Sequence, residues 1–379
     1  MPDGVGSPFQ GLTETKTVAA KPLTLRLAGS RRFHRFAARV PVLRWFARRE
    51  GEALFDLVSG FCQSQMLFAL VRLGVLADLQ TRPRKLAEVA QATDLPAERA
   101  RLLLRAGKAM QLCRPVAGRW RLTPRGAALL SVPGLAGMIA HHDVLYRDLA
   151  DPVAFLRGDT DPELARFWPY VFGAEAAADP DVARRYSTLM ADSMALVAED
   201  TLATGALKGV RHLMDVGGGT GAFLVAALSH VPRATLFDLP AVVAGARPRF
   251  EAAGLSDRVR IAAGSFTDDP LPTGSDAISL VRILYDHDDA TVAGLLAKCH
   301  AALPAGGRLI VSEPMLGEPD PQVAGDIYFA LYCLAMRTGK ARSPAEIAAQ
   351  LRNAGFARVH RHPSRRPFVT SVLTAVKPA

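Results

Sequence analysis

The stretch from Leu213 to Gly221 reads L-M-D-V-G-G-G-T-G and joins a short apolar run to a segment of helix-forming residues. Glycines at such a junction let the backbone turn sharply and approach a ligand closely. A second apolar run ends in Asp238, about 20 residues further on, where an acidic side chain can hold the hydroxyls of a ribose. The pattern predicts a strand, a tight turn and a helix, with a nucleoside bound outside the carboxyl ends of parallel strands.

The spacing of the glycines narrows the choice of nucleoside. Gly217, Gly219 and Gly221 form G-x-G-x-G, whereas dinucleotide-binding turns have G-x-G-x-x-G, and no lysine follows as in a phosphate-binding loop. S-adenosylmethionine carries no phosphate. The turn together with Asp238 therefore favours S-adenosylmethionine as the cofactor.

Apolar strands alternate with helical segments over residues 206–379, which we expect to form the cofactor-binding domain. The expected strands lie near 212–216, 234–237, 258–262, 277–281 and 308–312, with a further strand-like run from Phe368 to Val376. This alternation predicts an α/β fold with a doubly wound, Rossmann-like parallel sheet and a late antiparallel addition.

Residues 51–150 are predicted to form a mostly helical domain of the dimerisation and winged-helix type. Apolar residues recur at helical period over 52–79, with expected breaks at Gly60 and Gly74, which suits an oligomer interface or a core helix. Residues 84–130 follow the order helix, turn, helix, two-stranded wing and helix.

A winged helix can bind DNA, and three arginines on its second helix are candidates for such contacts: Arg99, Arg101 and Arg105. Leucines fill much of the same helix, so the arginines are equally well explained as a solvated face. DNA is therefore not the expected partner.

Residues 151–205 are expected to form a helical bridge that contributes to a substrate pocket. Its candidate wall residues are aromatic residues and methionines, although each could equally belong to the core: Trp168, Tyr170, Phe172, Tyr186, Met190 and Met194.

The positive charge of the chain is concentrated at its start. The net charge is +10, and residues 1–50 hold ten Lys or Arg against three Asp or Glu. Residues 21–49 hold nine Lys or Arg, no acid, and several aromatic residues between the charges. A basic amphipathic arm of this kind indicates contact with an anionic membrane. The alternative is an arm that packs on its own domain or on a dimer partner.

Composition otherwise indicates a reduced, cytoplasmic protein without disulfides or a metal. We expect no uninterrupted apolar run to be long enough to span a bilayer, and the start of the chain lacks the apolar core of a signal peptide. The four cysteines form no C-x-x-C pair. The cluster His141-His142-Asp143 lacks the spacing of a metal motif, and a surface loop is expected there.

Polar side chains follow the third, fourth and fifth strands of the predicted sheet. Ser265 and Phe266 end the third strand and suit hydrogen bonding and stacking at an adenine. The sequence V-R-I-L-Y-D-H-D-D leaves the fourth strand at Val281, and four titratable side chains in five positions indicate chemistry there. Asp288 or Asp289 is expected to cap the following helix. Glu313 places an acid at the tip of the fifth strand.

These motifs in this order resemble the plant caffeic-acid-type O-methyltransferases and their bacterial relatives: D-V-G-G-G-T-G, F-D-L-P, G-S-F, L-Y-D-H-D-D and S-E-P. The resemblance covers roughly residues 52–379. Within that family, the L-Y-D-H-D-D block, the basic arm and the A-L-F-D-L-V-S-G-F-C-Q-S-Q segment are most similar to the purple-bacterial enzymes of carotenoid biosynthesis. Those enzymes methylate the tertiary 1-hydroxyl of acyclic carotenoids of the spheroidene and spirilloxanthin type.

The resemblance implies S-adenosylmethionine as methyl donor, no metal, a homodimer, and a hydrophobic hydroxycarotenoid substrate. For a cytoplasmic enzyme, such a substrate is compatible with peripheral contact at an inner or intracytoplasmic membrane. The resemblance also implies the cofactor-binding residues: Gly217 and Gly219 at the methionine part, Asp238 at the ribose, Ser265 and Phe266 at the adenine, and Leu239 and Arg282 beside them.

The sequence departs from the family at the catalytic base. Plant members have a histidine where this chain has Tyr285, whereas Asp286 is kept and Glu313 matches the first of two acids that orient the histidine. The second acid is replaced by alanine in the segment Gly339-Lys340-Ala341-Arg342-Ser343. We hypothesise that Tyr285 positions the substrate hydroxyl and that Asp286 or His287 accepts its proton late in the reaction. His287, which replaces a tryptophan, could instead be a core residue.

Two other functions remain open on the sequence. The first is an O-methyltransferase that acts on a phenolic or polyketide hydroxyl. The second is a winged-helix DNA-binding regulator that senses S-adenosylmethionine.

Overall fold

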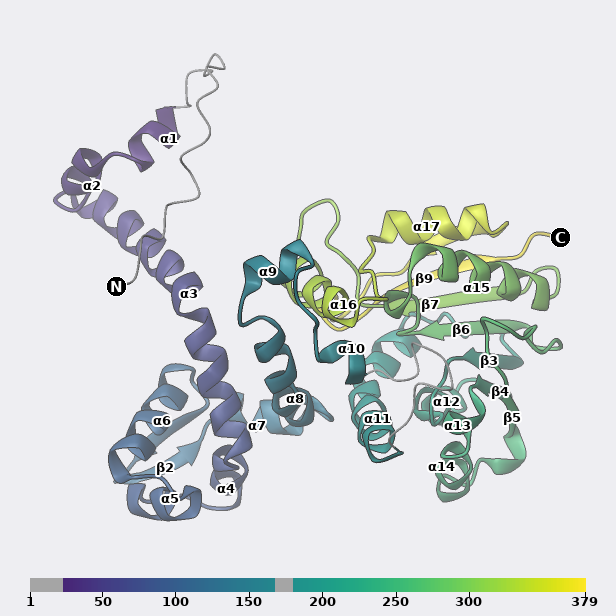
Figure 1. Cartoon of the computed structure of the whole chain (residues 1–379), viewed down its shortest axis with the longest axis horizontal. Coiled ribbons are helices and arrows are strands. Elements are labelled where there is room, and N and C mark those ends of the chain that lie inside the picture. The colour runs from purple at the N-terminus through teal and green to yellow at the C-terminus, as the bar shows by residue number, and fades with distance from the viewer. Residues whose placement is uncertain (1–22, 168–179) are drawn as a thin grey trace, which may run out of the picture. The chain divides into compact units, whose positions relative to one another are not determined.

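The computed structural model of the protein describes residues 23–167 and 180–379 (Figure 1). The chain divides into two compact units between Gln65 and Met66. The first unit holds α1 (Leu23–Ala28), α2 (Arg31–Ala37) and most of α3 (Pro41–Arg72). The second unit holds every described strand and the remaining helices.

The long helix α3 corrects two expectations. It runs unbroken through Gly60 and ends before Gly74, whose φ of 67° is left-handed, so only the break at Gly74 is confirmed. By length and composition, α3 could cross a membrane, with a window of mean hydropathy 1.4. The expectation that no segment is apolar and long enough was therefore wrong for α3. Among the described helices, α7 (Pro124–Ser131) and α8 (Leu135–Asp148) meet the same criterion only as a pair bent by 82°.

The expected winged helix is present after α3. Its elements are α4 (Val75–Thr81), α5 (Leu86–Thr93), α6 (Ala97–Ala109), β1 (Cys113–Val116), β2 (Arg119–Leu122) and α7 (Pro124–Ser131). Leu70, Leu76 and Leu104 are fully buried in its core. Thr123 begins α7 as its hydroxyl accepts a hydrogen bond from the amide of Gly126 (3.1 Å).

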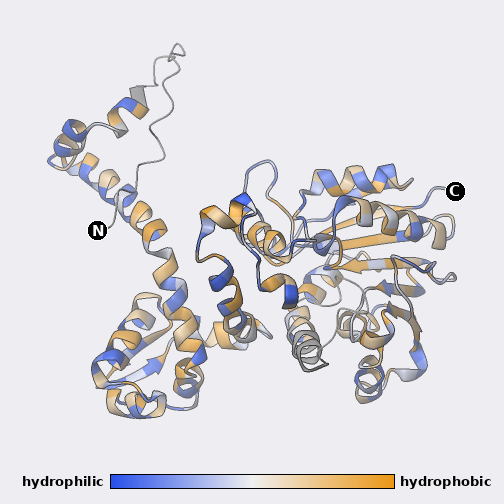
Figure 2. Ribbon diagram, in the orientation of Figure 1, coloured by the Kyte–Doolittle hydropathy of each residue, from blue (hydrophilic) through white to orange (hydrophobic). Residues whose placement is uncertain are grey.

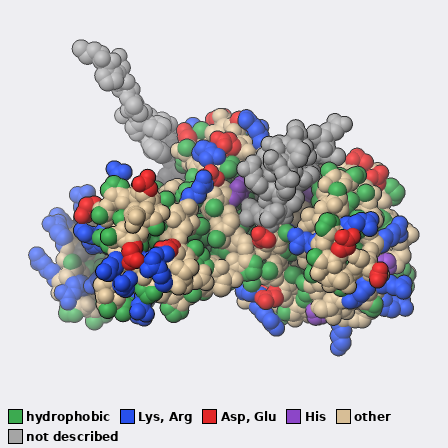
Figure 3. All heavy atoms as spheres, turned by 90° about the horizontal axis from the view of Figure 1, so that it is seen from below, with side chains coloured by type: hydrophobic (Ala, Val, Ile, Leu, Met, Phe, Trp, Pro, Cys, Tyr) green, Lys and Arg blue, Asp and Glu red, His purple; other side chains and the backbone are tan. Residues whose placement is uncertain are grey.

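The arginines of the winged helix lie on its surface. Figure 3 shows Lys and Arg side chains gathered over this part of the molecule, and Arg99, Arg101 and Arg105 on α6 are exposed. Arg101 pairs with Glu98 on the same helix (3.1 Å). The buried leucines and exposed arginines of α6 agree with the interpretation as a solvated helix face.

Four helices connect the winged helix to the sheet: α8 (Leu135–Asp148), α9 (Pro152–Arg157), α10 (Leu164–Phe167) and α11 (Pro180–Ala203). The segment His141-His142-Asp143 lies within α8, so the expected surface loop was wrong. His142 Nε2 lies 2.8 Å from the hydroxyl of Tyr328, which ties α8 to a distant part of the chain. The candidate wall residues Trp168, Tyr170 and Phe172 lie outside the described residues.

The predicted doubly wound sheet is confirmed. Its seven strands have the order β5-β4-β3-β6-β7-β9-β8. Their bounds are β3 (His212–Val216), β4 (Arg233–Asp238), β5 (Val259–Ala263), β6 (Ala277–Val281), β7 (Arg308–Glu313), β8 (Ala357–Arg361) and β9 (Ser371–Val376). The first five strands in the sheet order are parallel, and β9 pairs antiparallel with β7.

Strand β8 was not predicted from the sequence. It reads A-R-V-H-R, is mostly exposed, and pairs only with β9, through a register shift between Ala357 and His360. Charged residues and irregular pairing are typical of edge strands, where they hinder association with a further strand. The same polar composition hides such a strand from an apolar pattern.

Helices cover both faces of the sheet (Figure 1). On one face lie α12 (Ala222–Ala227), α13 (Pro240–Val243) and α14 (Ala246–Ala252), and on the other α15 (Asp289–Ala302) and α17 (Pro344–Asn353). Figure 2 shows hydrophobic residues concentrated on the central strands. Along β3, Leu213 packs in one core while Met214 and Val216 pack in the other, because successive side chains of a strand point to opposite faces.

The strand order reverses at β3, which pairs with β4 on one side and β6 on the other. Chain segments that leave β3 and β6 therefore diverge to opposite faces of the sheet. In open parallel sheets a ligand-binding crevice forms at this point, outside the carboxyl ends of the strands.

Candidate active site

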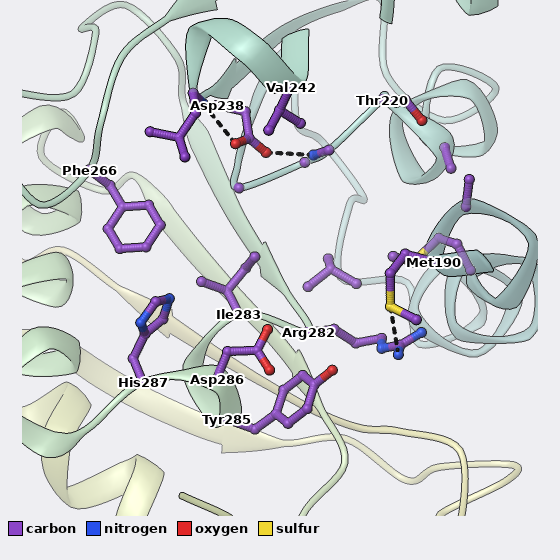
Figure 4. Close-up of a pocket in the computed structure, with 18 of the residues that line it drawn as sticks. Met190, Thr220, Asp238, Val242, Phe266, Arg282, Ile283, Tyr285, Asp286 and His287 are labelled. Atoms are coloured by element: carbon purple, nitrogen blue, oxygen red, sulfur yellow. Dashed lines mark hydrogen bonds between the residues drawn. The ribbon is translucent and has the colours of Figure 1, made fainter. Parts of the chain in front are cut away.

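A cleft lies where the sheet order reverses, and the space in and immediately outside it amounts to about 1250 Å³. Loops that follow β3, β4, β5 and β6 form its floor, and α11 closes one side with Met190, Ala191 and Met194 (Figure 4). Two of the six predicted wall residues, Met190 and Met194, thus line the cleft.

The glycine-rich turn has the conformation that the sequence predicts. Gly217, Gly219 and Gly221 have φ values of 70°, 61° and 80°, a region that side chains disfavour. A Cβ on Gly217 would lie 2.4 Å from Ile283 Cδ1, so this glycine is needed for packing. A Cβ on Gly219 would meet no atom within 4 Å, because Gly219 faces the open cleft.

Asp238 closes the turn from the tip of β4. Its Oδ2 accepts a hydrogen bond from the amide of Gly219, and its Oδ1 accepts one from the amide of Leu239, both at 2.7 Å (Figure 4). Burial raises the pKa of Asp238 to about 6, although both amides act in the opposite direction. Asp238 and Leu239 both line the cleft, at the position predicted for a ribose contact.

Asp215 lies near the end of β3, and its buried carboxyl group packs under Gly218 of the glycine turn. Its side chain is 1% exposed, and its Oδ1 accepts a hydrogen bond from the Ser279 hydroxyl at 2.6 Å. Its Oδ2 has no hydrogen-bond partner among the described residues. Burial raises the pKa of Asp215 to about 7, whereas the Ser279 hydroxyl acts to lower it.

The tip of β5 lines the cleft with Ser265 and Phe266. The Ser265 hydroxyl donates to Asp268 Oδ2 (2.8 Å), and its amide donates to Asp269 Oδ2 (2.8 Å), so Ser265 belongs to a tight turn. The ring of Phe266 meets the ring of His287 edge to face, with centroids 5.2 Å apart. One aromatic contact therefore joins the two halves of the cleft.

Arg282 follows β6 with a left-handed φ of 59° and turns its side chain toward α11 (Figure 4). Its guanidinium donates to the Ser193 hydroxyl (2.7 Å) and lies 3.4 Å from Met190 Sδ. The sequence analysis grouped Arg282 with the cofactor residues. It lines the same cleft. Its positive charge acts to lower the pKa values of Tyr285 and Asp286, which lie at the opposite end of the cleft from the glycine turn.

Tyr285, Asp286 and His287 lie together on the wall of the cleft opposite the glycine turn (Figure 4). Tyr285 and Asp286 belong to the short helix η4 (Leu284–Asp286) and are 4% and 8% exposed. His287 follows this helix and faces Phe266. Asp288 then caps α15 by accepting a hydrogen bond from the Thr291 amide (2.8 Å), which confirms one of the two expected caps.

Burial controls the protonation of these three groups. It raises the pKa of Asp286 well above its ordinary value, with the charge of Glu313 adding to the effect and Arg282 opposing it. It raises the pKa of the Tyr285 phenol, so this group keeps its proton. It lowers the pKa of His287 to about 4, so the imidazole is neutral at pH 7.

Glu313 lies behind the cleft rather than in it. Its side chain is 1% exposed, and its Oε1 accepts hydrogen bonds from the amides of Ile283 and Leu284, both at 2.8 Å. Burial raises the pKa of Glu313 to about 7. The carboxyl group therefore fixes the position of the two backbone amides that precede Tyr285.

Sequence reasoning missed Arg342. Its guanidinium is almost fully buried and donates to the carbonyls of Leu284 (2.7 Å) and His287 (2.9 Å) and to the carboxylate of Asp289 (2.8 Å). In the sequence, the segment around Ala341 stands out only for its missing acid. No local pattern could pair Arg342 with residues more than 50 positions earlier.

The structure brings the predicted cofactor residues to one cleft and adds three of the four predicted catalytic residues, with Glu313 behind them. Among the described residues, no group of three or more His, Cys, Asp or Glu side chains could hold a metal ion. All four cysteines are free.

Comparisons with known proteins agree on one family. Residues 146–357 match the profile of the O-methyltransferase domain, and residues 55–132 match that of the O-methyltransferase dimerisation domain. A demethylspheroidene O-methyltransferase of Cereibacter sphaeroides is 56% identical over 94% of this chain and 95% of that protein. One of Rhodobacter capsulatus is 53% identical over 92% and 88%.

A solved structure with a similar fold contains SAH as its ligand. It is the SAH-bound form of a methyltransferase of calicheamicin biosynthesis, 28% identical to this chain. It has a TM-score of 0.71 and covers 87% of this chain and 98% of its own.

The buried carboxyl group of Asp215 predicts a pH dependence of stability. A raised native pKa means that the folded state keeps its proton longer than the unfolded chain does. The free energy of unfolding therefore falls as the pH rises from about 4 to 7. In D215N this decline should be smaller, with the contributions of Asp238, Asp286 and Glu313, whose pKa values burial also raises, remaining. Urea unfolding between pH 5 and pH 8 measures the slope.

A second variant tests the same assignment in the opposite direction. Because the Ser279 hydroxyl lowers the pKa of Asp215, S279A should extend the decline above pH 7. Equal slopes in the wild type, D215N and S279A would contradict the assignment.

Proposed function

Because the chain belongs to the O-methyltransferase family, with both its dimerisation and its catalytic domain, we propose that it methylates a hydroxycarotenoid. The methyl group comes from S-adenosylmethionine, and the acceptor is the tertiary 1-hydroxyl of an acyclic carotenoid. The observation that carries the proposal is 56% identity, over almost the whole of both chains, to a protein named for demethylspheroidene O-methylation.

The residues of the cleft fit S-adenosylmethionine. Gly219 leaves open space at the turn, and Asp238 presents a half-buried carboxyl group that suits ribose hydroxyls. Among the described residues of the cleft, Arg282 is the one Lys or Arg, and its guanidinium is directed to Ser193 and Met190. The lining thus suits a nucleoside without phosphates. When bound, S-adenosylmethionine supplies an activated methyl group on a positively charged sulfur.

Methylation of an alkanol places particular demands on the acceptor side. A phenol has a pKa near 10, as tyrosine does, and an alkanol is a far weaker acid. Early deprotonation by a histidine would be ineffective, so positioning of the oxygen carries most of the catalysis. Tyr285, which keeps its proton, donates a hydrogen bond to the substrate oxygen and holds it in place. Its position on the cleft wall supports this role.

Asp286 is the better of the two candidate proton acceptors. Its raised pKa makes its carboxylate a stronger base than His287, whose pKa is about 4. A positive charge nearby favours the ionised form, so Asp286 becomes a base when a cation occupies the cleft.

This assignment predicts unequal effects of two substitutions. D286N removes the acceptor and should lower kcat by about 10²-fold to 10⁴-fold, the range typical of general bases. H287A should lower kcat much less, because neutral His287 acts only through its contact with Phe266. Single-turnover methyl transfer measures both rates. If the two variants keep near-normal turnover, or if H287A is the slower one, the assignment is wrong.

The substrate is tested by offering two acceptors to the wild-type protein. With labelled S-adenosylmethionine in detergent, we expect transfer to a 1-hydroxycarotenoid and none to a catechol-type phenol. D238A, with its ribose contact removed, is the control for cofactor-dependent transfer. Transfer to the phenol alone would contradict the carotenoid assignment while leaving the enzyme class intact.

A homodimer is proposed from the exposed face at the middle of α3. Leu54, Phe55, Leu57, Val58 and Phe61 are between 63% and 80% exposed. An exposed apolar face of this kind on a helix normally marks an interaction site. The match to the dimerisation domain begins at residue 55, which supports a second copy as its partner.

We also propose that the basic arm, defined as residues 23–50, docks on an anionic membrane. Phe36, Trp45 and Phe46 are more than half exposed, and the Arg49 guanidinium lies 5.7 Å from the ring centroid of Trp45. Basic residues that alternate with exposed aromatic side chains suit the boundary between headgroups and acyl chains. A carotenoid substrate would be held in such a membrane.

Binding to liposomes tests the basic arm. R31E/R35E should weaken sedimentation with anionic liposomes, because each basic residue near an anionic surface contributes about 1 kcal/mol. Binding should also fall with added salt. The double variant R247E/R249E makes the same charge change on exposed residues of α14 and should bind as the wild type does. Equal loss in both double variants would contradict a specific role of the arm.

A further inference from the structure

We infer that Arg342 is a positioning residue for methyl transfer, which sets the geometry of the acceptor segment Tyr285–His287 through its backbone. The inference deepens the proposed function, because it concerns the same acceptor site. It rests on contacts that surround this segment on every side and that involve none of its three side chains.

The guanidinium of Arg342 joins both ends of the acceptor segment. It donates to the carbonyl of Leu284, just before Tyr285, and to the carbonyl of His287, at the end of the segment. Its third partner is the carboxylate of Asp289, which also accepts hydrogen bonds from Lys340 (2.7 Å) and Gln350 (2.9 Å). One planar cation thereby fixes the distance between two carbonyls that bracket the reacting side chains.

The segment that carries Arg342 makes the remaining contact. The amide of Lys340 donates to the carbonyl of Tyr285 (2.9 Å). A Cβ on Gly339 would lie 2.7 Å from that same carbonyl, so the close approach needs a glycine. On the opposite side, Glu313 accepts the amides of Ile283 and Leu284. The backbone from Ile283 to His287 is therefore held by the carboxyl group of Glu313 at its start and by the Arg342 guanidinium at Leu284 and His287.

A constraint on the backbone matters here because the main chain places the side chains of Tyr285 and Asp286 in the cleft. Asp286 Oδ1 has no hydrogen-bond partner among the described residues, and the acid at position 341 is absent. The geometry of Tyr285 and Asp286 toward a substrate oxygen then depends on the main chain as well as on the side-chain hydrogen bonds of Tyr285 with Arg282 and with Asp286. A misplacement of 1 Å in such a group can cost about 100-fold in rate.

A residue that only stabilised the fold would behave differently from a positioning residue. The chain offers a matched comparison in Arg258, whose guanidinium donates to the carbonyls of Leu228, Val231 and Pro232 at 2.6 to 2.9 Å. Arg258 follows α14 at the far end of β4 and β5, away from the cleft, and is partly exposed where Arg342 is buried. R258Q removes a similar set of carbonyl contacts.

The experiment compares R342Q, R342K, D289N and R258Q in the full-length protein. Thermal unfolding, the Kd for S-adenosylmethionine and single-turnover methyl transfer are measured for each. We expect kcat to fall about 100-fold in R342Q, with the cofactor Kd unchanged. The kcat values of R342K and D289N should lie between those of R342Q and the wild type, because each variant keeps part of the contacts that Arg342 makes with Leu284, His287 and Asp289. R258Q should lose thermal stability and keep its kcat.

Hydrogen exchange gives a readout that needs no acceptor. The amides of residues 283–289 should exchange faster in R342Q, and those near residues 228–233 faster in R258Q. Unchanged exchange at 283–289, or equal losses of kcat in R342Q and R258Q, would overturn the role of Arg342. A wild-type protein that methylates no carotenoid would overturn the proposed substrate, whereas the exchange comparison would still decide the role of Arg342.

Discussion

The buried carboxyl group of Glu313 supports the whole acceptor side of the cleft. The strand order requires the chain to leave β6 abruptly, and Arg282 takes a left-handed conformation there. The next two amides point into the protein, where no water can satisfy them, and Glu313 accepts both. Because that carboxyl group stands at the tip of β7, the geometry of the cleft depends on the register between two neighbouring strands.

Three buried acidic side chains lower the stability of this domain. Asp215, Asp286 and Glu313 are each less than a tenth exposed, and burial raises the pKa of all three. A domain selected for stability alone would replace such groups by apolar side chains. They lie at the ends of the strands that form the cleft. Departures from good packing that gather at one site are typical of residues kept for function.

The sequence was sufficient for the parts of the molecule that have a strong local pattern. The glycine turn, Asp238 and the five parallel strands follow from apolar runs and glycine spacing, as does the winged helix. The unpredicted parts depend on contacts distant in sequence. Strand β8 has the polar composition of an edge, and Arg342 reaches residues 53 to 58 positions earlier. The uninterrupted course of α3 through Gly60 shows that one glycine costs too little to end a long helix.

The contact between Phe266 and His287 has a consequence for the order of events. The phenylalanine lies where a nucleoside base is expected, and the histidine lies beside the acceptor. A molecule that moves one ring changes its contact with the other, which links the two halves of the cleft. Thermodynamic linkage makes such an influence reciprocal. In the proposed reaction, a bound acceptor would thus influence the donor side of the cleft, and a spent donor would influence the release of the methylated product.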